Sequence, residues 1–319
     1  MPGLAIAAAG SAAPVVRVSQ ITKRYGETLA LDGIELELRA GEIYGLIGPD
    51  GAGKSSLLKI IAGILAQDAG ELQVFGQRVS TEAQAELIKD QLGLMPQGLG
   101  QNLYADLSIE ENIDYFAGLR LLTRSELSER KEALLQATRL AKFRDRPMKN
   151  LSGGMKQKLG LVCTLIHEPR LVILDEPTTG VDPVSRREFW SILARLLEEK
   201  NITALVSTAY MDEASRFHRV SLMHAGKVLA SGEPAGLSQL AQGTLYSISG
   251  ADAGLQMQLL KSLQSDYPQI DVLGQEIRLF ADQGSDVNDL PERLHALQND
   301  HPALNLAALE PELEDVFIA

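Results

Sequence analysis

One stretch decides the fold of this chain: Gly48-Pro49-Asp50-Gly51-Ala52-Gly53-Lys54-Ser55. It matches the phosphate-loop pattern G-x-x-x-x-G-K-[ST], in which backbone amides surround a phosphate and the lysine adds a positive charge. Residues 42–48 before it predict a buried strand, and residues 55–65 repeat apolar side chains with helical spacing. Strand, glycine-rich loop and helix are the context that such a loop requires. We therefore predict that residues 48–55, with Ser56 directly after them, bind the phosphates of a nucleotide.

Two acidic residues supply the chemistry that the loop lacks. Asp175 and Glu176 follow the apolar run 171–174, which predicts a buried strand. A carboxylate at the carboxyl end of a parallel strand lies at the ligand-binding edge of the sheet. We expect Asp175 to hold Mg²⁺ through water while the Ser55 hydroxyl ligates it. Glu176 would orient or deprotonate the attacking water, and Lys54 would stabilise the β- and γ-phosphates.

Apolar strands alternate with helical segments, and this pattern predicts an α/β fold with a mostly parallel sheet covered on both faces. The run 203–207 adds another buried strand to 42–48 and 171–174. From about Leu103 to Phe143 the pattern is helical. Ser108 and Glu111 have the spacing of a capping box there.

The pattern changes after Gly232-Glu233-Pro234. Six segments then indicate strand, helix, strand, strand, helix and strand, namely 244–249, 255–265, 269–273, 276–280, 287–297 and 305–308. This βαββαβ order suits a small ferredoxin-like α+β domain. We therefore expect a flexible extension over residues 1–14, a nucleotide-binding domain over 15–235 and an accessory domain over 236–319.

Composition excludes several classes of protein. Apolar residues make up 45% of the chain and charged residues 23%, as in ordinary globular proteins. The net charge is −12, and residues 236–319 carry three Lys and Arg against thirteen Asp and Glu. Such a surface does not attract nucleic acid, so we expect no nucleic-acid partner.

No apolar run approaches the roughly 20 residues that a membrane-spanning helix needs. The single cysteine, Cys163, sits in an apolar run and is expected to be buried and inert.

A second anion site is predicted at Leu151-Ser152-Gly153-Gly154-Met155-Lys156-Gln157-Lys158. Ser152 is a good helix N-cap, and the helix that follows exposes unpaired amides that attract anions. An ordinary helix start does not need the pair Gly153-Gly154, so this motif indicates more than a cap.

With these residues together, the sequence resembles the nucleotide-binding subunit of an ATP-binding cassette (ABC) transporter over residues 15–234, and LSGGMKQK is the specific signature. The resemblance implies a P-loop cassette with a helical subdomain at about 99–165 that binds ATP and Mg²⁺. It implies that Tyr25 stacks on adenine, that Gln97 contacts Mg²⁺ and the membrane subunit, and that Asp182 lies at a dimer interface. Two cassettes would face head to tail, with the γ-phosphate gripped from the partner by Ser152, Gly153 and Gly154.

Two stretches narrow the resemblance. Residues 310–317, Glu-Pro-Glu-Leu-Glu-Asp-Val-Phe, are similar to the closing motif of cassettes that serve ABC-2 type permeases. Residues 95–104 are similar to the first cassette of ribosome-associated ATPase-like exporters. The resemblance thus implies an ABC-2 exporter for drug-like or other small molecules and a cytoplasmic location on the inner face of the cell membrane. Its partners would be permease subunits, a second cassette (identical or not) and a periplasmic adaptor.

One position departs from the family. Where the family has a histidine that contacts the γ-phosphate, this chain has Ala209, which cannot form that hydrogen bond. Losing one such contact commonly lowers the rate by ~10²–10³. His218, at ~1.5 Å per residue along a helix from Met211, is too far to replace it, and His224 is expected to be structural. One alternative that follows from Ala209 is a regulatory cassette that binds ATP but hydrolyses it poorly. A second alternative, which does not depend on this position, is a soluble ribosome-associated ABC ATPase.

Overall fold

The computed structural model describes residues 13–98, 100, 102–237, 243–265, 267, 270–282 and 290–309. The chain divides into two compact units, with the division between Ser231 and Gly232. Each unit has its own sheet and its own hydrophobic core, and each is described by itself. Among the helices that the structure describes, none is long and apolar enough to cross a bilayer.

A six-stranded sheet forms the centre of the first unit, in the order β10-β9-β3-β8-β7-β6. The pairs β3·β8, β3·β9, β7·β8 and β6·β7 are parallel, so the predicted parallel sheet is present. Every residue of β3, β7 and β8 is buried, as the continuous apolar runs require. The strands span Ile43–Ile47 (β3), Leu92–Met95 (β6), Leu171–Asp175 (β7), Thr203–Thr208 (β8), Arg219–His224 (β9) and Lys227–Gly232 (β10).

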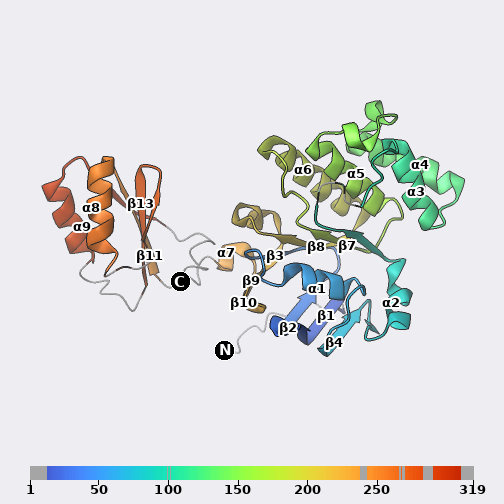
Figure 1. The fold of residues 1–319 in the computed structure, drawn as a ribbon, viewed down its shortest axis with the longest axis horizontal. Coiled ribbons are helices and arrows are strands. Elements are labelled where there is room, and N and C mark those ends of the chain that lie inside the picture. Colours follow the sequence, from blue (N-terminus) through green and yellow to red (C-terminus); the bar gives the residue numbers. More distant parts are fainter. Residues whose placement is uncertain are drawn as a thin grey trace, which may run out of the picture. The chain divides into compact units, whose positions relative to one another are not determined.

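Helices cover the two faces of this sheet (Figure 1). Helix α1 (Lys54–Ile61) lies on one face, and α5 (Gly153–Leu165) and α6 (Pro183–Lys200) lie on the other. Cys163 on α5 is buried, and burial raises the pKa of its thiol, which agrees with an inert cysteine.

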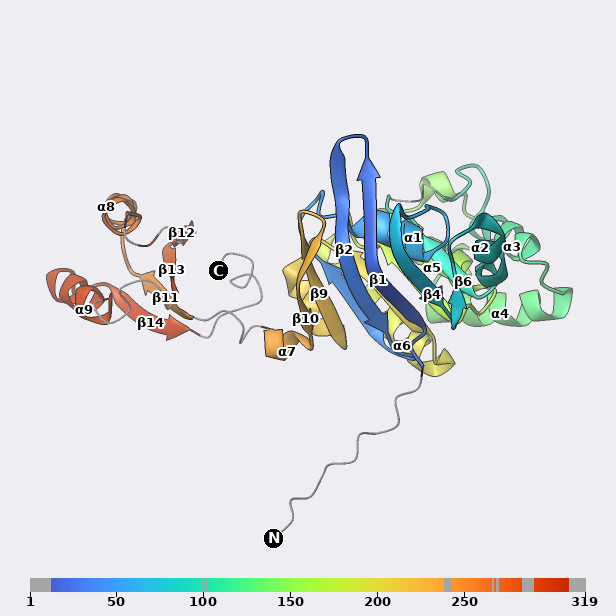
Figure 2. The ribbon, with the colours of Figure 1, turned by 90° about the horizontal axis from the view of Figure 1, so that it is seen from below.

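A second, antiparallel sheet packs on the side of α1, which the sequence patterns did not predict as a separate layer (Figure 2). Its strands are β1 (Val16–Tyr25), β2 (Thr28–Leu38), β4 (Ala69–Val74) and β5 (Gln77–Arg78), in the order β2-β1-β4-β5. One hydrophobic core joins this sheet, α1 and the parallel sheet. Helix α2 (Glu82–Lys89) follows β5 and packs on β6.

The helical part of the first unit lies between β6 and β7. It contains α3 (Ile109–Leu119), α4 (Arg124–Ala137), two 3₁₀ turns (Ala141–Phe143 and Met148–Asn150) and α5. The predicted capping box begins α3: Glu111 N donates to Ser108 Oγ at 3.1 Å, and Ser108 N donates to Glu111 Oε2 at 2.8 Å. Thr123 and Glu126 form a second box at the start of α4, whose T-x-x-E pattern was readable in the sequence.

The second unit has the predicted βαββαβ order. Its elements are β11 (Gly243–Ser249), α8 (Ala253–Leu263), β12 (Ile270–Leu273), β13 (Glu276–Asp282), α9 (Leu290–Asp300) and β14 (Asn305–Leu309). The sheet order is β12-β13-β11-β14 with every pair antiparallel, which is the ferredoxin-like arrangement. Helices α8 and α9 lie on one face, where Leu259, Leu263 and Leu294 enter the core.

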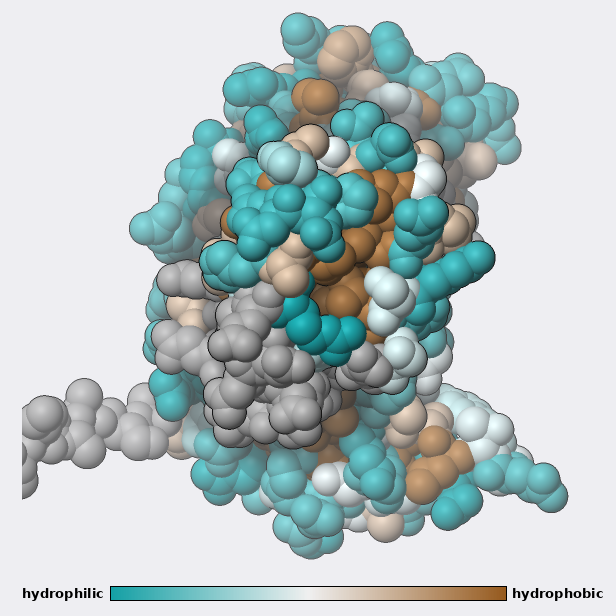
Figure 3. Space-filling view, turned by 90° about the vertical axis from the view of Figure 1, so that its left-hand side faces the viewer, coloured by the Kyte–Doolittle hydropathy of each residue, from teal (hydrophilic) through white to brown (hydrophobic). Residues whose placement is uncertain are grey.

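A short helix, α7 (Pro234–Leu237), follows β10. Figure 3 shows a face of the second unit on which hydrophilic side chains surround a smaller hydrophobic area. The expected closing motif at residues 310–317 lies outside the described residues, as does Leu99 at the expected start of the helical subdomain.

Candidate nucleotide site

The predicted phosphate loop connects β3 to α1, and its backbone is tightly enclosed. A Cβ on Gly48 would lie 2.1 Å from Met223 O, and one on Gly53, at φ +98°, would lie 2.5 Å from Ala30 O. Side chains are therefore excluded at both positions. Gly53 is the N-cap of α1 and offers no side chain to cap it, which leaves the first amides of the helix available to an anion. The loop borders a cavity of about 370 Å³ lined by Ala30, Asp50, Gly51, Ala52, Gly53, Lys54, Ser55, Ser56, Gln97 and Glu176.

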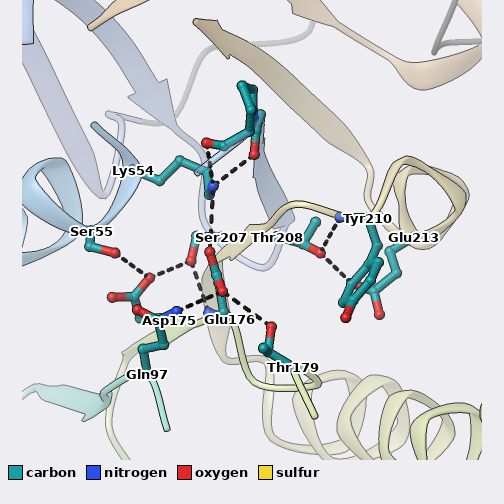
Figure 4. Close-up of polar contacts among 12 residues, drawn as sticks. Lys54, Ser55, Gln97, Asp175, Glu176, Thr179, Ser207, Thr208, Tyr210 and Glu213 are labelled. Carbon is teal, nitrogen blue, oxygen red and sulfur yellow. Dashed lines mark hydrogen bonds and ion pairs between the residues drawn. The ribbon is translucent and has the colours of Figure 1, made fainter. Parts of the chain in front are cut away.

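Lys54 reaches across the base of this cavity (Figure 4). Its Nζ donates to Gly48 O at 2.7 Å and to Pro49 O at 3.0 Å, and it lies 3.5 Å from Glu176 Oε1. The lysine side chain is buried. The loop thus presents one enclosed cation where phosphates would enter.

Ser55 and Asp175, the predicted magnesium residues, meet although they are 120 residues apart: Ser55 Oγ donates to Asp175 Oδ1 at 3.0 Å. Ser207 Oγ, at the end of β8, donates to the same oxygen at 2.6 Å. Among the described residues no group of three or more His, Cys, Asp and Glu could hold a metal by itself. One hydroxyl and one carboxylate fit Mg²⁺, which takes one or two protein oxygens and completes its shell with water and substrate phosphates.

Besides the ion pair with Lys54, Glu176 is held by three neighbours. Its backbone N donates to Ser207 Oγ at 2.9 Å, and its φ of +46° turns the chain sharply after β7. Its Oε2 accepts from Gln97 Nε2 at 2.8 Å and from Thr179 Oγ1 at 3.1 Å. The Gln97 amide nitrogen thus contacts the predicted water-orienting carboxyl; its role as a magnesium ligand stays a prediction.

Sequence reasoning missed Ser207 and Thr179 as site residues. Ser207 comes directly after the buried run 203–206, and β8 is parallel to β7, so the rule that located Asp175 also applied to it. Thr179 carried no comparable signal, because its contact depends on the turn that begins at Glu176.

Tyr25 ends β1 at the rim of the loop. The residue is 49% exposed, and its hydroxyl lies 3.3 Å from Ser56 Oγ. Lys23 Nζ lies 5.9 Å from the ring centroid. An exposed aromatic side chain beside Ser56 is suited to stacking on a base, and its contact with adenine stays a prediction.

Ser152, Gly153 and Gly154 do not line the phosphate-loop cavity. They begin α5, where Ser152 Oγ accepts from Met155 N at 3.3 Å. A Cβ on Gly154 would lie 2.6 Å from Ser185 Cβ, because the starts of α5 and α6 are in contact. Ser152 is exposed whereas Gly154 is buried, and the expected contact of these three residues with a partner's γ-phosphate stays a prediction. Asp182 caps α6 by accepting from Ser185 N at 2.9 Å.

Ala209 follows β8 and is exposed. The 3₁₀ helix after it, η3, spans Met211–Arg216 and ends before His218. His218 lies directly before β9, where its Nδ1 accepts from Ile43 N at 2.9 Å, and His224 ends β9. Neither histidine therefore replaces the residue that the family has at position 209.

Comparison with known proteins matches residues 31–179 to the family model described as "ABC transporter". The probable multidrug ABC transporter ATP-binding protein YbhF of Escherichia coli (strain K12) is 36% identical over 310 residues, covering 95% of this chain and 51% of that protein. The chain thus spans about half the length of that relative. The Nod factor export ATP-binding protein I of Burkholderia pseudomallei (strain 1710b) is 33% identical over 97% of both chains.

Solved structures give the same fold. The cbiO1 protein of Clostridium perfringens matches with a TM-score of 0.66 at 23% identity, over 81% of this chain and 97% of that one. An ATP-binding cassette in its ADP conformation matches with a TM-score of 0.63 at 25% identity, over 70% and 92%. The architecture described above is therefore that of an ATP-binding cassette.

Proposed function

This chain belongs to the ABC transporter family of ATP-binding proteins, and on that premise we propose that it hydrolyses ATP to energise a separate ABC-2 type permease in the direction of export. The observation that carries the proposal is that Lys54 and Glu176 meet at one cavity, while Asp175, at the end of β7, is hydrogen-bonded to the cavity residue Ser55. A protein that only bound nucleotide would not need an acid held beside the phosphates.

Each residue has a physical task in this reaction. Lys54 and the amides at the start of α1 would bind the β- and γ-phosphates. Ser55 and Asp175 would hold Mg²⁺, which neutralises phosphate charge when bound. Glu176, fixed by Gln97 and Thr179, would orient the attacking water and accept its proton.

A second cavity supports a membrane partner. It measures about 390 Å³ and lies where the helical part meets the core. Ile64 and Leu119 line it, and both are large apolar side chains that are 61% exposed. A helix of a permease that rests at the cytoplasmic membrane face would bury them, and the chain would then be peripheral to the membrane.

The names of the relatives support export. One is called a probable multidrug transporter protein and another a Nod factor export protein. The regulatory alternative is favoured by Ala209, whose methyl group gives no hydrogen bond to a γ-phosphate.

Two measurements test the proposal. The purified chain should hydrolyse ATP with Mg²⁺. The Glu176→Gln variant should still bind Mg-ATP, but its turnover rate should fall by at least about 10²-fold, since a positioned base contributes about that much. Robust binding with no turnover in the unaltered chain would support the regulatory alternative instead.

Membrane association tests the partner. Leu119→Asp should release the chain from membranes of cells that express it, whereas Leu87→Asp should not, because Leu87 is equally exposed on α2 but does not line the cavity. Equal release by both variants, or by neither, would contradict docking at this cavity.

A further inference from the structure

A buried glutamate lies behind the nucleotide site. Glu213, on η3, is 1% exposed, whereas its neighbour Asp212 is at the surface with its Oδ2 3.9 Å from Arg186 Nη1. Burying a carboxyl group is costly unless hydrogen-bond donors surround it. Glu213 has such donors, and they come from three different segments of the chain.

The directions of these hydrogen bonds follow from the atoms. Trp190 Nε1 can only donate, and it does so to Glu213 Oε1 at 2.7 Å, where Thr178 Oγ1 also donates at 2.8 Å. Thr208 Oγ1 donates to Glu213 Oε2 at 2.7 Å. Tyr210 N donates to Thr208 Oγ1 at 3.0 Å, so that hydroxyl accepts from the backbone and directs its own proton to the carboxyl group.

Two of these donors, Thr178 and Thr208, adjoin residues of the site, and Figure 4 shows Thr208 with its hydrogen bond to Glu213. Thr178 is two residues after Glu176, and the next residue, Thr179, donates to Glu176 Oε2. Thr208 follows Ser207, which contacts Asp175 Oδ1 and Glu176 N. Glu213 therefore connects the turn after β7 to the end of β8, while Trp190 anchors both to α6.

We propose that Glu213 is a positioning residue for ATP hydrolysis, which holds the Glu176 turn and the loop at Ala209 in fixed relation to each other. The inference rests on the proposed ATPase function. Ala209 has no polar side chain, and the Tyr210–Thr208–Glu213 chain of hydrogen bonds is one of the contacts that hold this loop, together with the hydrogen bond from Glu213 N to Tyr210 O. Displacing reacting groups by about 1 Å can lower a rate by about 10²-fold, so a residue that never touches ATP can act on turnover.

The decisive variant is Glu213→Gln, which keeps size and shape. Its amide NH₂ must face either the Thr208 hydroxyl or the Thr178–Trp190 pair, and both sides already donate. We expect kcat to fall about tenfold or more while Mg-ATP affinity and KM stay unchanged. Asp212→Asn makes the same chemical change at the exposed neighbour and should leave kcat unchanged.

A second pair of variants covers the case in which Glu213→Gln folds poorly. Thr208→Val removes the hydroxyl but keeps the shape, and should reproduce the loss of kcat. Thr208→Ser keeps the hydroxyl and should restore most of the rate. A residue that served only to stabilise the fold would lower the melting temperature without this separation of kcat from KM.

Trp190 is the only tryptophan of the chain, and its emission gives a readout independent of turnover. Mg-ATP should change that emission in the unaltered chain, because Glu213 joins the indole to both loops of the site. In Glu213→Gln the change should disappear while ATP still binds. If the unaltered chain binds ATP without hydrolysing it, the proposed function fails and this fluorescence comparison decides the inference. The inference would be overturned if folded Glu213→Gln had the same kcat as the unaltered chain, or if Mg-ATP changed its Trp190 emission as it does in the unaltered chain.

Discussion

Lys54 Nζ lies 3.5 Å from Glu176 Oε1, and both side chains are buried. The cation of the phosphate loop and the predicted water-orienting acid thus pair with each other across the cavity. A triphosphate that draws Lys54 away would release one carboxyl oxygen of Glu176, while Gln97 and Thr179 keep hold of the other. Nucleotide binding would in this way leave Oε1 of Glu176 available to bind the attacking water, while the position of its side chain stays fixed.

Removal of this lysine tests the site. We expect Lys54→Ala to lower Mg-ATP affinity by at least about tenfold, because a buried charge-assisted contact to phosphate is lost. Isothermal titration calorimetry measures the affinity. Lys59→Ala is the control, since Lys59 is on the same helix but exposed. Wild-type-like binding by folded Lys54→Ala would refute the assignment of the loop.

Restoring a histidine at position 209 tests the missing contact. Ala209→His should raise turnover at saturating Mg-ATP about tenfold or more, since a preorganised donor at the γ-phosphate contributes at least that much. An otherwise slow homodimer would indicate that the chain works best beside a non-identical cassette and contributes Ser152, Gly153 and Gly154 to the competent site. Fast turnover without the substitution, and no gain with it, would show that another group already does this task.

Deletion of residues 238–319 tests the independence of the first unit. None of the described residues that line the nucleotide cavity comes after Glu176, and the six-stranded sheet is complete at Gly232. We expect the shortened chain to keep its Mg-ATP affinity and to associate differently with a second cassette or with membranes. Unfolding of the shortened chain, seen by circular dichroism, would mean that the second unit is needed for the fold of the first.

His167 predicts how stability depends on pH. Burial, with the nearby Arg120 charge, lowers the pKa of its imidazole from 6.5 to about 4. Its Nε2 lies 3.0 Å from Leu92 O, and its buried Nδ1 has no hydrogen-bond partner among the described residues. The unfolded chain therefore binds this proton more readily than the folded chain, and the free energy of unfolding should fall as pH drops from 6.5 to 4, by up to about 3 kcal/mol.

Urea unfolding at pH values across this window measures the effect. The His167→Gln variant cannot take up the proton, so its stability should change less over the same range. An equal pH slope in the variant and the unaltered chain would assign the effect to other groups.

Local sequence patterns were enough to predict much of the structure of this protein. The strand, loop and helix around Lys54 lie within about twenty residues of sequence. The capping box at Ser108 and each strand of the second unit are likewise short, local segments of the sequence. Positions where the backbone must turn or expose amides require particular residue types, and these are visible without knowing the fold. Asp175 and Glu176 were placed correctly at the sheet edge because parallel strands bring their carboxyl ends together.

Contacts between distant segments depended on the tertiary structure. Thr178 and Glu213 are 35 residues apart and Ser55 and Asp175 are 120 apart, so no local pattern pairs them. Gly154 must be glycine because Ser185 of another helix approaches it, and the antiparallel sheet beside α1 follows from the way a shared core is packed. The sequence alone thus determined the phosphate loop, the acids and the order of elements, since these rest on local backbone geometry. Only the packing of those elements decided which side chains hold Glu176 and lie behind it, because those contacts exist once the whole core has closed.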